Sequence, residues 1–252
     1  GQAVSAANMF AALQGSEIVK SHRHGDGVVQ DAYSLRCAPQ VAGAARDTLA
    51  HANLVATREL ASVIDNPVVL ESGEVTSNGN FHGAPVAQVL DFLAISVADL
   101  GSISERRTDR FLDVSRNRGL PAFLAHDPGV DSGLMIAQYT QAGLVSENKR
   151  LASPASVDSI PSSAMQEDHV SMGWHAARKL RKAIDNLRRI VAIELVTAAR
   201  AVEMRAPLKP APLTADLISQ LRKTVPGLGP DRDLGEELEA AHQVLINMDE
   251  NI

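Results

Sequence analysis

Hydrophobic residues recur every three to four positions along most of this chain, which is the spacing of one face of an α-helix. The longest such stretch, residues 166–205, runs for some forty residues and is typical of a central helix in a bundle. Pro and Gly divide the pattern, because Pro disfavours a helical conformation at the preceding residue and Gly often ends a helix. The pattern predicts helices near 4–13, 35–63, 85–111, 131–150 and 166–205, and two short ones after Pro207 and Pro210.

One segment, residues 68–80, has strand character instead. VVL and EVT flank the turn-forming ESG, which predicts a short hairpin, and the SNGN that follows is typical of a turn. Pro85 is expected in the first turn of the next helix. Asp131 or Ser132 is expected to cap the helix that follows the polar loop 113–132.

These elements predict an all-α protein, a long-helix bundle with one short β-hairpin-like segment. Residues 1–205 are expected to form a central helical bundle that carries the candidate motifs, and residues 206–252 to add short helices packed on it. A forty-residue helix would be about 60 Å long, which exceeds a compact domain of this size. Its apolar stripe should therefore be buried against further copies or another polypeptide.

Composition narrows the functional classes. Aromatic residues make up 3% of the 252 residues, which disfavours a β-sandwich or barrel. The net charge, 24 − 30 = −6, argues against a basic nucleic-acid or anionic-membrane binder. The single Cys37 has no partner for an internal disulfide. Because neither a membrane-length apolar run nor a signal-peptide pattern is evident, we expect a soluble, cytoplasmic protein.

No metal site is expected from the histidines. His22 and His24 lie in a polar loop that offers no evident third ligand. His169 and His175 are six residues apart, which places them on different faces of a helix. Solvated side chains are the favoured interpretation for both pairs.

Two charge runs hold most of the cations, SERRTDR (104–110) and RKLRKAIDNLRR (178–189). Acidic residues are interleaved and aliphatic residues keep the helical period. Solvated helix faces with i, i+4 pairs are therefore favoured over a phosphate-binding patch. The chain has neither a GxSxG motif nor a Gly-rich phosphate loop.

Gln30, Tyr33 and Arg36 are spaced three residues apart, so on a helical turn their side chains fan over about a third of the circumference. A guanidinium can bind a carboxylate through two parallel hydrogen bonds, and a phenol can donate or shuttle a proton. The pattern is compatible with a carboxylate-bearing ligand, although a polar helix start packed on a neighbour explains the same residues.

Asn80, Phe81 and Glu167 form the other candidate positions. An amide and a ring in a Gly-rich turn could line a pocket, or could cap and staple the helix that follows. Glu167 is expected to open the longest helix, where an acid suits the helix dipole. It could equally aim a carboxylate at a cationic or NH-bearing substrate group.

At these segments the chain resembles the histidine ammonia-lyase branch of the aromatic amino acid lyase and aminomutase family. The matching stretches are ordered and evenly spread, and they cover what looks like the carboxy-terminal half of such an enzyme. They are QDAYSLRCAPQVAGA, IDNPVV, SNGNFHGAPVAQ, SERRTDR and SSAMQEDHVSMG.

The resemblance implies an all-α homotetramer that eliminates ammonia from L-histidine to give trans-urocanate without an external cofactor. The family's electrophile, methylidene-imidazolone, forms from an internal Ala-Ser-Gly triad. Glu71-Ser72-Gly73 and Asp131-Ser132-Gly133 are the nearest strings here, and neither has the family context. The electrophile is thus expected in an amino-terminal half supplied elsewhere, and this chain alone is expected to be inactive.

The resemblance also assigns site residues. Arg36 would bind the substrate carboxylate, Tyr33 would lie near the electrophile and the departing amine, and Gln30 would hydrogen-bond nearby. No metal ligand is expected among them.

Phe81 matches a phenylalanine that packs beside the electrophile, and Asn80 precedes it in the same turn. Glu167 matches an acidic residue near the substrate imidazole. A carboxylate suits an imidazole NH and poorly suits a phenyl ring, which favours histidine over phenylalanine or tyrosine.

Two alternatives remain open from the residues. The chain could be a non-catalytic helical assembly module in which the motifs are relics of ancestry. It could also belong to a tyrosine ammonia-lyase or aminomutase, with the same chemistry on another substrate.

Overall fold

The computed structural model describes residues 1–24 and 27–249 and confirms an all-α fold. Two short 3-10 turns, η1 (Ala122–Leu124) and η2 (Ser163–Met165), interrupt the loops. The remaining elements are α1 (Gln2–Ala12), α2 (Glu17–Ser21), α3 (Tyr33–Arg36), α4 (Ala38–Leu60), β1 (Val68–Val69), β2 (Val75–Thr76), α5 (Ala84–Leu112), α6 (Met135–Leu151), α7 (Gly173–Glu203), α8 (Pro212–Leu221) and α9 (Gly235–Asp249).

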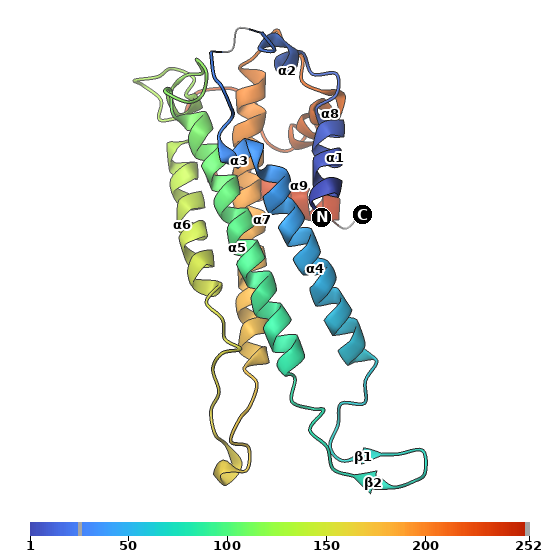
Figure 1. Cartoon of the computed structure of the whole chain (residues 1–252). Helices are drawn as coiled ribbons and strands as arrows, with labels where there is room; N and C mark the ends of the chain where they lie inside the picture. The colour runs from blue at the N-terminus through green and yellow to red at the C-terminus, as the bar shows by residue number, and fades with distance from the viewer. Residues whose placement is uncertain (25–26, 250–252) are drawn as a thin grey trace.

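The centre of the molecule is a bundle in which α5 and α7 pack along each other, with α4 against α5 and α6 against both (Figure 1). Helices α1, α2, α8 and α9 gather at one end of the bundle, and the β1–β2 hairpin and η2 lie at the other. Since α7 has 31 residues, it is about 46 Å long. The bundle is therefore elongated, with loops at both ends.

Small residues allow α5 and α7 to approach closely. Ala94 and Ala183 are fully buried between them. A Cβ added to Gly101 would lie 3.2 Å from Ile190 Cδ1, so this glycine admits the side chain of the facing helix. The high alanine content is thus used at helix contacts, where close packing gives the most dispersion energy.

The charge runs form ion pairs between helices as well as a local pair on α5, in which Arg106 lies 3.6 Å from Asp109 at i, i+3. Arg107 of α5 binds Glu194 of α7 with two hydrogen bonds from its guanidinium. Lys179 of α7 binds Asp91 of α5 at 3.1 Å. A sequence pattern cannot reveal such pairs, because the partners are nearly ninety residues apart.

The predicted start of the longest helix is wrong. It begins at Gly173 instead of 166, so Glu167 precedes the helix and does not open it. Ser163, Ala164 and Met165 all have positive φ, and residues 162 and 167 bond to each other through their backbones. A chain that turns back on itself here leaves no continuous helical backbone, although the side-chain pattern favours one.

The predicted cap of α6 is also wrong. The helix begins at Met135 without a side-chain cap. The Asp131 carboxylate instead accepts hydrogen bonds from the backbone N–H groups of Asp127 (3.1 Å) and Asp231 (3.0 Å). Asp131 therefore joins two loops instead of ending a helix.

Helix α5 is long and apolar enough to span a membrane by length and composition. The sequence analysis expected no apolar run of membrane length, and α5 is such a run by these two criteria. In the structure α5 is the core helix of the bundle, contacted by α4, α6 and α7. It also buries Asp91 and Glu105, which suits a packed bundle better than lipid.

The hairpin is confirmed at the position expected. Val68 pairs with Thr76 and Val69 with Val75 in an antiparallel register. The Asn78 side chain donates to the Asp65 carbonyl at 2.8 Å, which secures the base of the hairpin.

Candidate functional site

Tyr33 and Arg36 lie on the one-turn helix α3, whereas Gln30, the third residue of the three-residue spacing, lies outside it. The Arg36 guanidinium carbon stands 4.8 Å above the centre of the Tyr33 ring, a cation–π geometry. Tyr33 is 70% exposed. Within the described residues, neither the phenol nor the guanidinium has a hydrogen-bond partner, so both are free to meet a ligand. Gln30 is exposed in the bend just before the helix.

Helix α3 is held in place by residues that the sequence analysis did not select. Arg107 Nη1 donates to the Ser34 carbonyl at 3.3 Å. Glu194 in turn accepts from Arg107 and from Ser104 Oγ, the latter at 2.6 Å. This network fixes the backbone under Tyr33 to both central helices.

Asn80 and Phe81 lie in the turn between the hairpin and α5. Asn80 Nδ2 donates to the Val63 carbonyl at 2.6 Å, and its backbone N–H donates to Asn78 Oδ1 at 2.8 Å. Asn80 therefore secures the turn to the segment that follows α4, and within residues 1–24 and 27–249 its side-chain oxygen accepts no hydrogen bond. Phe81 is 54% exposed.

Glu167 lies in the loop between η2 and α7, with an exposed carboxylate. Ser162 Oγ donates to Glu167 Oε2 at 2.5 Å. Hydrogen bonds from Ser162 and Ser163 hold the pKa of Glu167 below its ordinary 4.5. The carboxylate is thus ionised at neutral pH and already oriented.

The six candidate residues fall into two groups in one chain. The first group lies beside Arg107 of α5, which donates to the Ser34 carbonyl. The second group lies at the start of α5, because Phe81 is two residues before Gly83, the residue that precedes this helix. Arg107 and Gly83 are 24 positions apart on one helix, a distance of about 36 Å. Tyr33, Arg36 and Gln30 therefore lie far from Asn80, Phe81 and Glu167 (Figure 1).

The second group is joined by two histidines, His169, which the sequence analysis weighed only as a metal ligand, and His82, which it did not single out. His82 follows Phe81, and its Nε2 lies 3.2 Å from Nδ1 of His169. No group of three potential metal-ligating residues occurs in residues 1–24 and 27–249.

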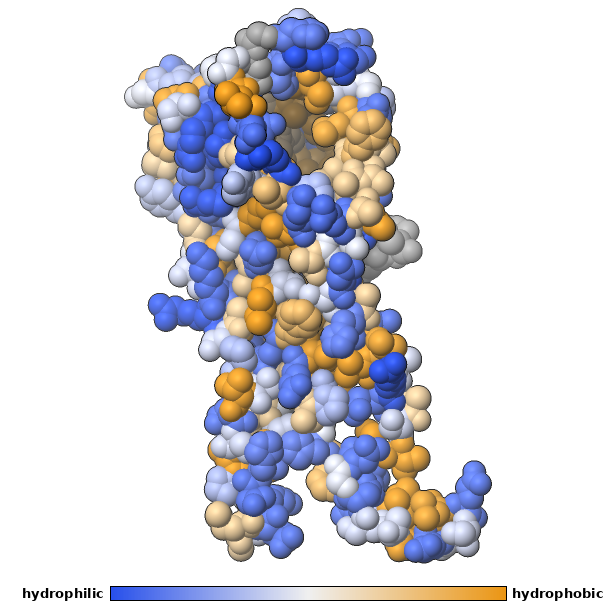
Figure 2. Space-filling view, in the orientation of Figure 1, coloured by the Kyte–Doolittle hydropathy of each residue, from blue (hydrophilic) through white to orange (hydrophobic). Residues whose placement is uncertain are grey.

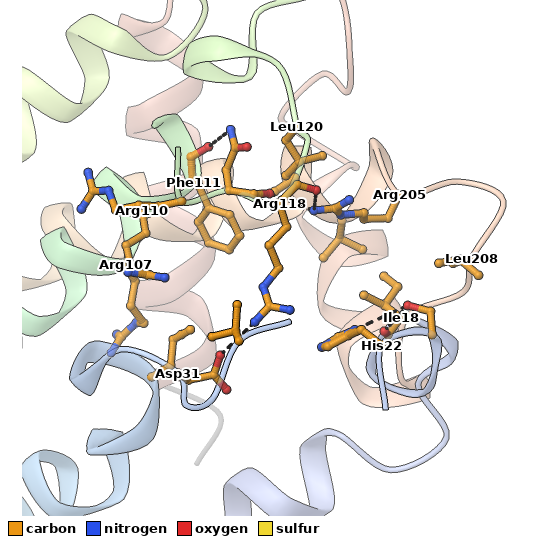
Figure 3. A pocket seen from close by; sticks show the side chains of 17 residues that line it. Ile18, His22, Asp31, Arg107, Arg110, Phe111, Arg118, Leu120, Arg205 and Leu208 are labelled. Carbon is orange, nitrogen blue, oxygen red and sulfur yellow. Dashed lines mark hydrogen bonds and ion pairs between the residues drawn. The ribbon is translucent and has the colours of Figure 1, made fainter. Parts of the chain in front are cut away.

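A cavity of about 740 Å³ opens beside α3 (Figure 3). Asp31 and Leu35 contribute to it from either side of Tyr33, and Arg107 and Phe111 from α5. Arg118 reaches across it to Asp31 at 3.4 Å. Such a lining, apolar with several guanidinium groups, suits a small anion with an apolar body. Its walls come from distant segments, which is why the sequence pattern does not reveal it.

The two strings that resemble the Ala-Ser-Gly triad are parts of ordinary turns. The Gly73 N–H donates to the Leu70 carbonyl at 2.9 Å in the hairpin turn. The N–H groups of Ser132 and Gly133 donate to the Asp231 carboxylate at 2.6 and 2.9 Å. Both glycine nitrogens thus donate hydrogen bonds that hold their own turns.

Comparison with known proteins accounts for nearly the whole chain. The model of the family described as aromatic amino acid lyase matches residues 1–223. A histidine ammonia-lyase of Streptomyces avermitilis is 72% identical over 242 residues, 96% of this chain and 47% of that protein. The chain thus spans about half the length of the curated relatives it matches.

Solved structures agree. The crystal structure of histidine ammonia-lyase from Trypanosoma cruzi superposes with a TM-score of 0.84 at 44% identity, over 87% of this chain and 44% of that one. The tyrosine aminomutase from Streptomyces globisporus gives a TM-score of 0.87 at 38% identity, over 97% and 50%. The helical bundle is therefore shared across members that differ in their named reaction.

Proposed function

Because this chain belongs to the aromatic amino acid lyase family, we propose that it is the carboxy-terminal part of a histidine ammonia-lyase. The complete enzyme eliminates ammonia from L-histidine and releases trans-urocanate. The high identity to curated histidine ammonia-lyases along nearly the whole chain carries this proposal.

Arg36 and Tyr33 receive the amino-acid end of the substrate. The Arg36 guanidinium binds the carboxylate through two parallel hydrogen bonds, which fixes its direction as well as its position. Tyr33 orients the amine or exchanges a proton with it. Gln30, in the preceding bend, adds a hydrogen bond. The absence of internal partners for the phenol and the guanidinium in the described residues supports these roles.

Glu167 and Phe81 receive the imidazole end. An ionised carboxylate accepts a hydrogen bond from an imidazole NH and stabilises the protonated ring. The hydrogen bonds from Ser162 and Ser163, which lower the pKa of Glu167, support this role. Phe81 offers an exposed apolar ring, and the side-chain oxygen of Asn80, which has no hydrogen-bond donor among the described residues, is a further acceptor.

The active site is composite, formed by separate polypeptide segments. About 36 Å separates the two groups in one chain, so a single molecule of the substrate L-histidine cannot contact both. The chain also exposes 14977 Å², whereas a compact monomer of its 26.8 kDa exposes about 10,800 Å². We propose that an amino-terminal half and further copies, in a homotetramer, cover this surface and bring Arg36 of one copy to Glu167 of another.

The electrophile belongs to the amino-terminal half in this proposal. A methylidene-imidazolone from an Ala-Ser-Gly triad supplies the covalent activation that lets the amine leave. This chain's residues suit the surroundings of such a group, since Tyr33 and Phe81 present a free phenol and an exposed ring. No external cofactor is required. We place the assembled enzyme in the cytoplasm.

The proposal is tested with the full-length enzyme that contains this chain and its amino-terminal half. Histidine is supplied and urocanate is followed by its ultraviolet absorbance. We expect turnover by the full-length enzyme and none by the 252-residue chain alone. Urocanate from the pure chain would refute the dependence on an external triad.

Arg36→Ala is expected to lower kcat/KM for histidine by about a hundredfold, because two charge-assisted hydrogen bonds are lost. Arg46→Ala, at an exposed arginine of α4, is the matched control and should have little effect. Equal activity of both variants would favour a non-catalytic assembly module. Conversion of tyrosine in preference to histidine would favour the tyrosine lyase or aminomutase alternative.

A further inference from the structure

We propose that His82 and His169 form a positioning pair that sets the place of Phe81 relative to Glu167. This inference rests on the proposed function, because it concerns the imidazole-binding group of the same site. Neither histidine needs to touch the substrate. Their role is to join two loops that each carry one substrate-contacting residue.

The pair has a defined geometry. The two imidazole rings are stacked, with centroids 5.3 Å apart and planes inclined by 14°. His82 Nε2 lies 3.2 Å from His169 Nδ1 and 3.1 Å from the His169 backbone carbonyl oxygen. One ring nitrogen therefore faces two atoms of the same residue.

We assign the hydrogens from these contacts. A carbonyl oxygen only accepts, so we assign the hydrogen to His82 Nε2, which lies 3.1 Å from that oxygen. His169 Nδ1 faces the same N–H and must present its lone pair. His169 therefore carries its own hydrogen on Nε2. The N–H of His82 is shared between two acceptors, and the bond is lost if His82 has no donor.

The pair connects loops that are otherwise held separately. On one side, Asn80 binds the Val63 carbonyl. On the other, Glu167 binds Ser162, and the Val170 N–H donates to Ser159 Oγ at 2.9 Å. Among the described residues, only the hydrogen bonds between His82 and His169 join these two loops directly.

The pair lies close to the two side chains that it positions. His82 is bonded to Phe81, and His169 is two residues after Glu167. Both Phe81 and Glu167 lie outside the helices, so the bundle does not orient them directly. An error of about 1 Å in such a position can cost about 100-fold in rate. The contact between the histidines ties the two loops together next to both side chains.

The test separates the hydrogen bond from the stacked ring. In the full-length enzyme, His82→Phe keeps a ring but removes the N–H, whereas His82→Gln keeps an N–H but removes the ring. We expect kcat/KM for histidine to fall by about ten- to hundredfold in His82→Phe and by about threefold or less in His82→Gln. Equal losses in the two variants would overturn the proposal.

His175→Phe is the matched control, at an exposed histidine near the start of α7. It should change kcat/KM by about twofold or less, as ordinary surface substitutions do. A loss as large as that of His82→Phe would contradict a specific role of the pair.

A double-mutant cycle tests whether His82 acts through Glu167. Once Glu167→Gln has removed the carboxylate, His82→Phe should add little further loss. Independent, multiplying losses would show that His82 does not position Glu167 and would overturn the proposal.

Solid-state ¹⁵N NMR of histidine-labelled enzyme tests the pair even where a variant does not assemble. We expect a protonated Nε2 on His82 and an unprotonated Nδ1 on His169, and the reverse on either would overturn the proposal. A full-length enzyme that shows this pattern but does not convert histidine would instead overturn the proposed function alone.

Discussion

At the scale of single residues, the ion pair between Asp91 and Lys179 anchors the loop that leads to Glu167. Only 4% of the Asp91 side chain and 11% of the Lys179 side chain are exposed. Asp91 also accepts from the Ser156 N–H at 2.6 Å, and Lys179 donates to the Ser153 carbonyl. Two buried charges between α5 and α7 thus hold the first part of this loop on the bundle.

Lys179→Met is expected to lower the free energy of unfolding by about 3 kcal/mol, because it leaves Asp91 buried without its counter-charge. Urea denaturation measures the change. Lys182→Met is the control, since Lys182 lies 4.0 Å from Glu147 in an exposed pair and should cost less than about 1 kcal/mol. Equal losses would contradict the anchoring role of Lys179.

The pH dependence of stability should reflect Asp91 as well. Burial raises the pKa of Asp91, but the Ser156 hydrogen bonds and Lys179 outweigh it, so the pKa lies below 3.8. A lowered pKa means that the carboxylate stabilises the fold above about pH 3.8 and loses this effect as the pH falls through the folded value.

The stability difference between the wild type and Asp91→Asn should therefore be constant near neutral pH and shrink below pH 3.8. Denaturation midpoints over a pH series measure it. A difference that grows towards acid pH would show that the pKa of Asp91 is raised instead.

At the scale of elements, two helical glycines have opposite surroundings. A side chain at Gly101 on α5 would meet Ile190 of α7 at 3.2 Å, whereas one at Gly143 on α6 would meet nothing within 4 Å. The first glycine serves the contact between the two central helices. No contact among the described residues requires a glycine at position 143. There it only lowers the helix propensity of α6.

Gly101→Leu is expected to destabilise the chain by about 1–3 kcal/mol through overpacking against α7. Gly143→Ala should stabilise it by up to about 1 kcal/mol. Thermal unfolding followed by circular dichroism measures both. A stable Gly101→Leu variant would mean that α5 and α7 can separate without cost.

At the scale of the whole molecule, the elongated bundle exposes large apolar side chains along its length (Figure 2). A set of them lies on the long helices and remains at least 46% exposed in the described part of the chain. It comprises Leu49 and Leu54 of α4, Phe92 and Ile95 of α5, Ile136 and Tyr139 of α6, and Trp174 of α7. Exposed apolar surface of this extent is typical of association surfaces.

We expect the 252-residue chain to self-associate in solution at micromolar concentration. Sedimentation velocity would reveal species heavier than the 26.8 kDa chain. Replacing Phe92 and Ile95 by Ser should shift the distribution towards the monomer. A wild-type chain that stays monomeric would show that these faces do not drive association on their own.

The sequence by itself determined the fold class, the hairpin and most helix positions. Hydrophobic spacing and the Pro and Gly positions predicted α1, α4 and α5 closely, because these signals are local and act within a few residues. The matching segments also identified the family, and the assignment of Tyr33, Arg36, Phe81 and Glu167 to its site stays a prediction.

Only the tertiary structure decided how these residues lie in space. It separated Arg36 from Glu167 along α5, paired His82 with His169, and joined Lys179 to Asp91. It also began α7 at Gly173, after left-handed residues that the side-chain pattern did not indicate. These contacts join residues some seventy to ninety positions apart, and they depend on how long helices pack, which local periodicity does not encode.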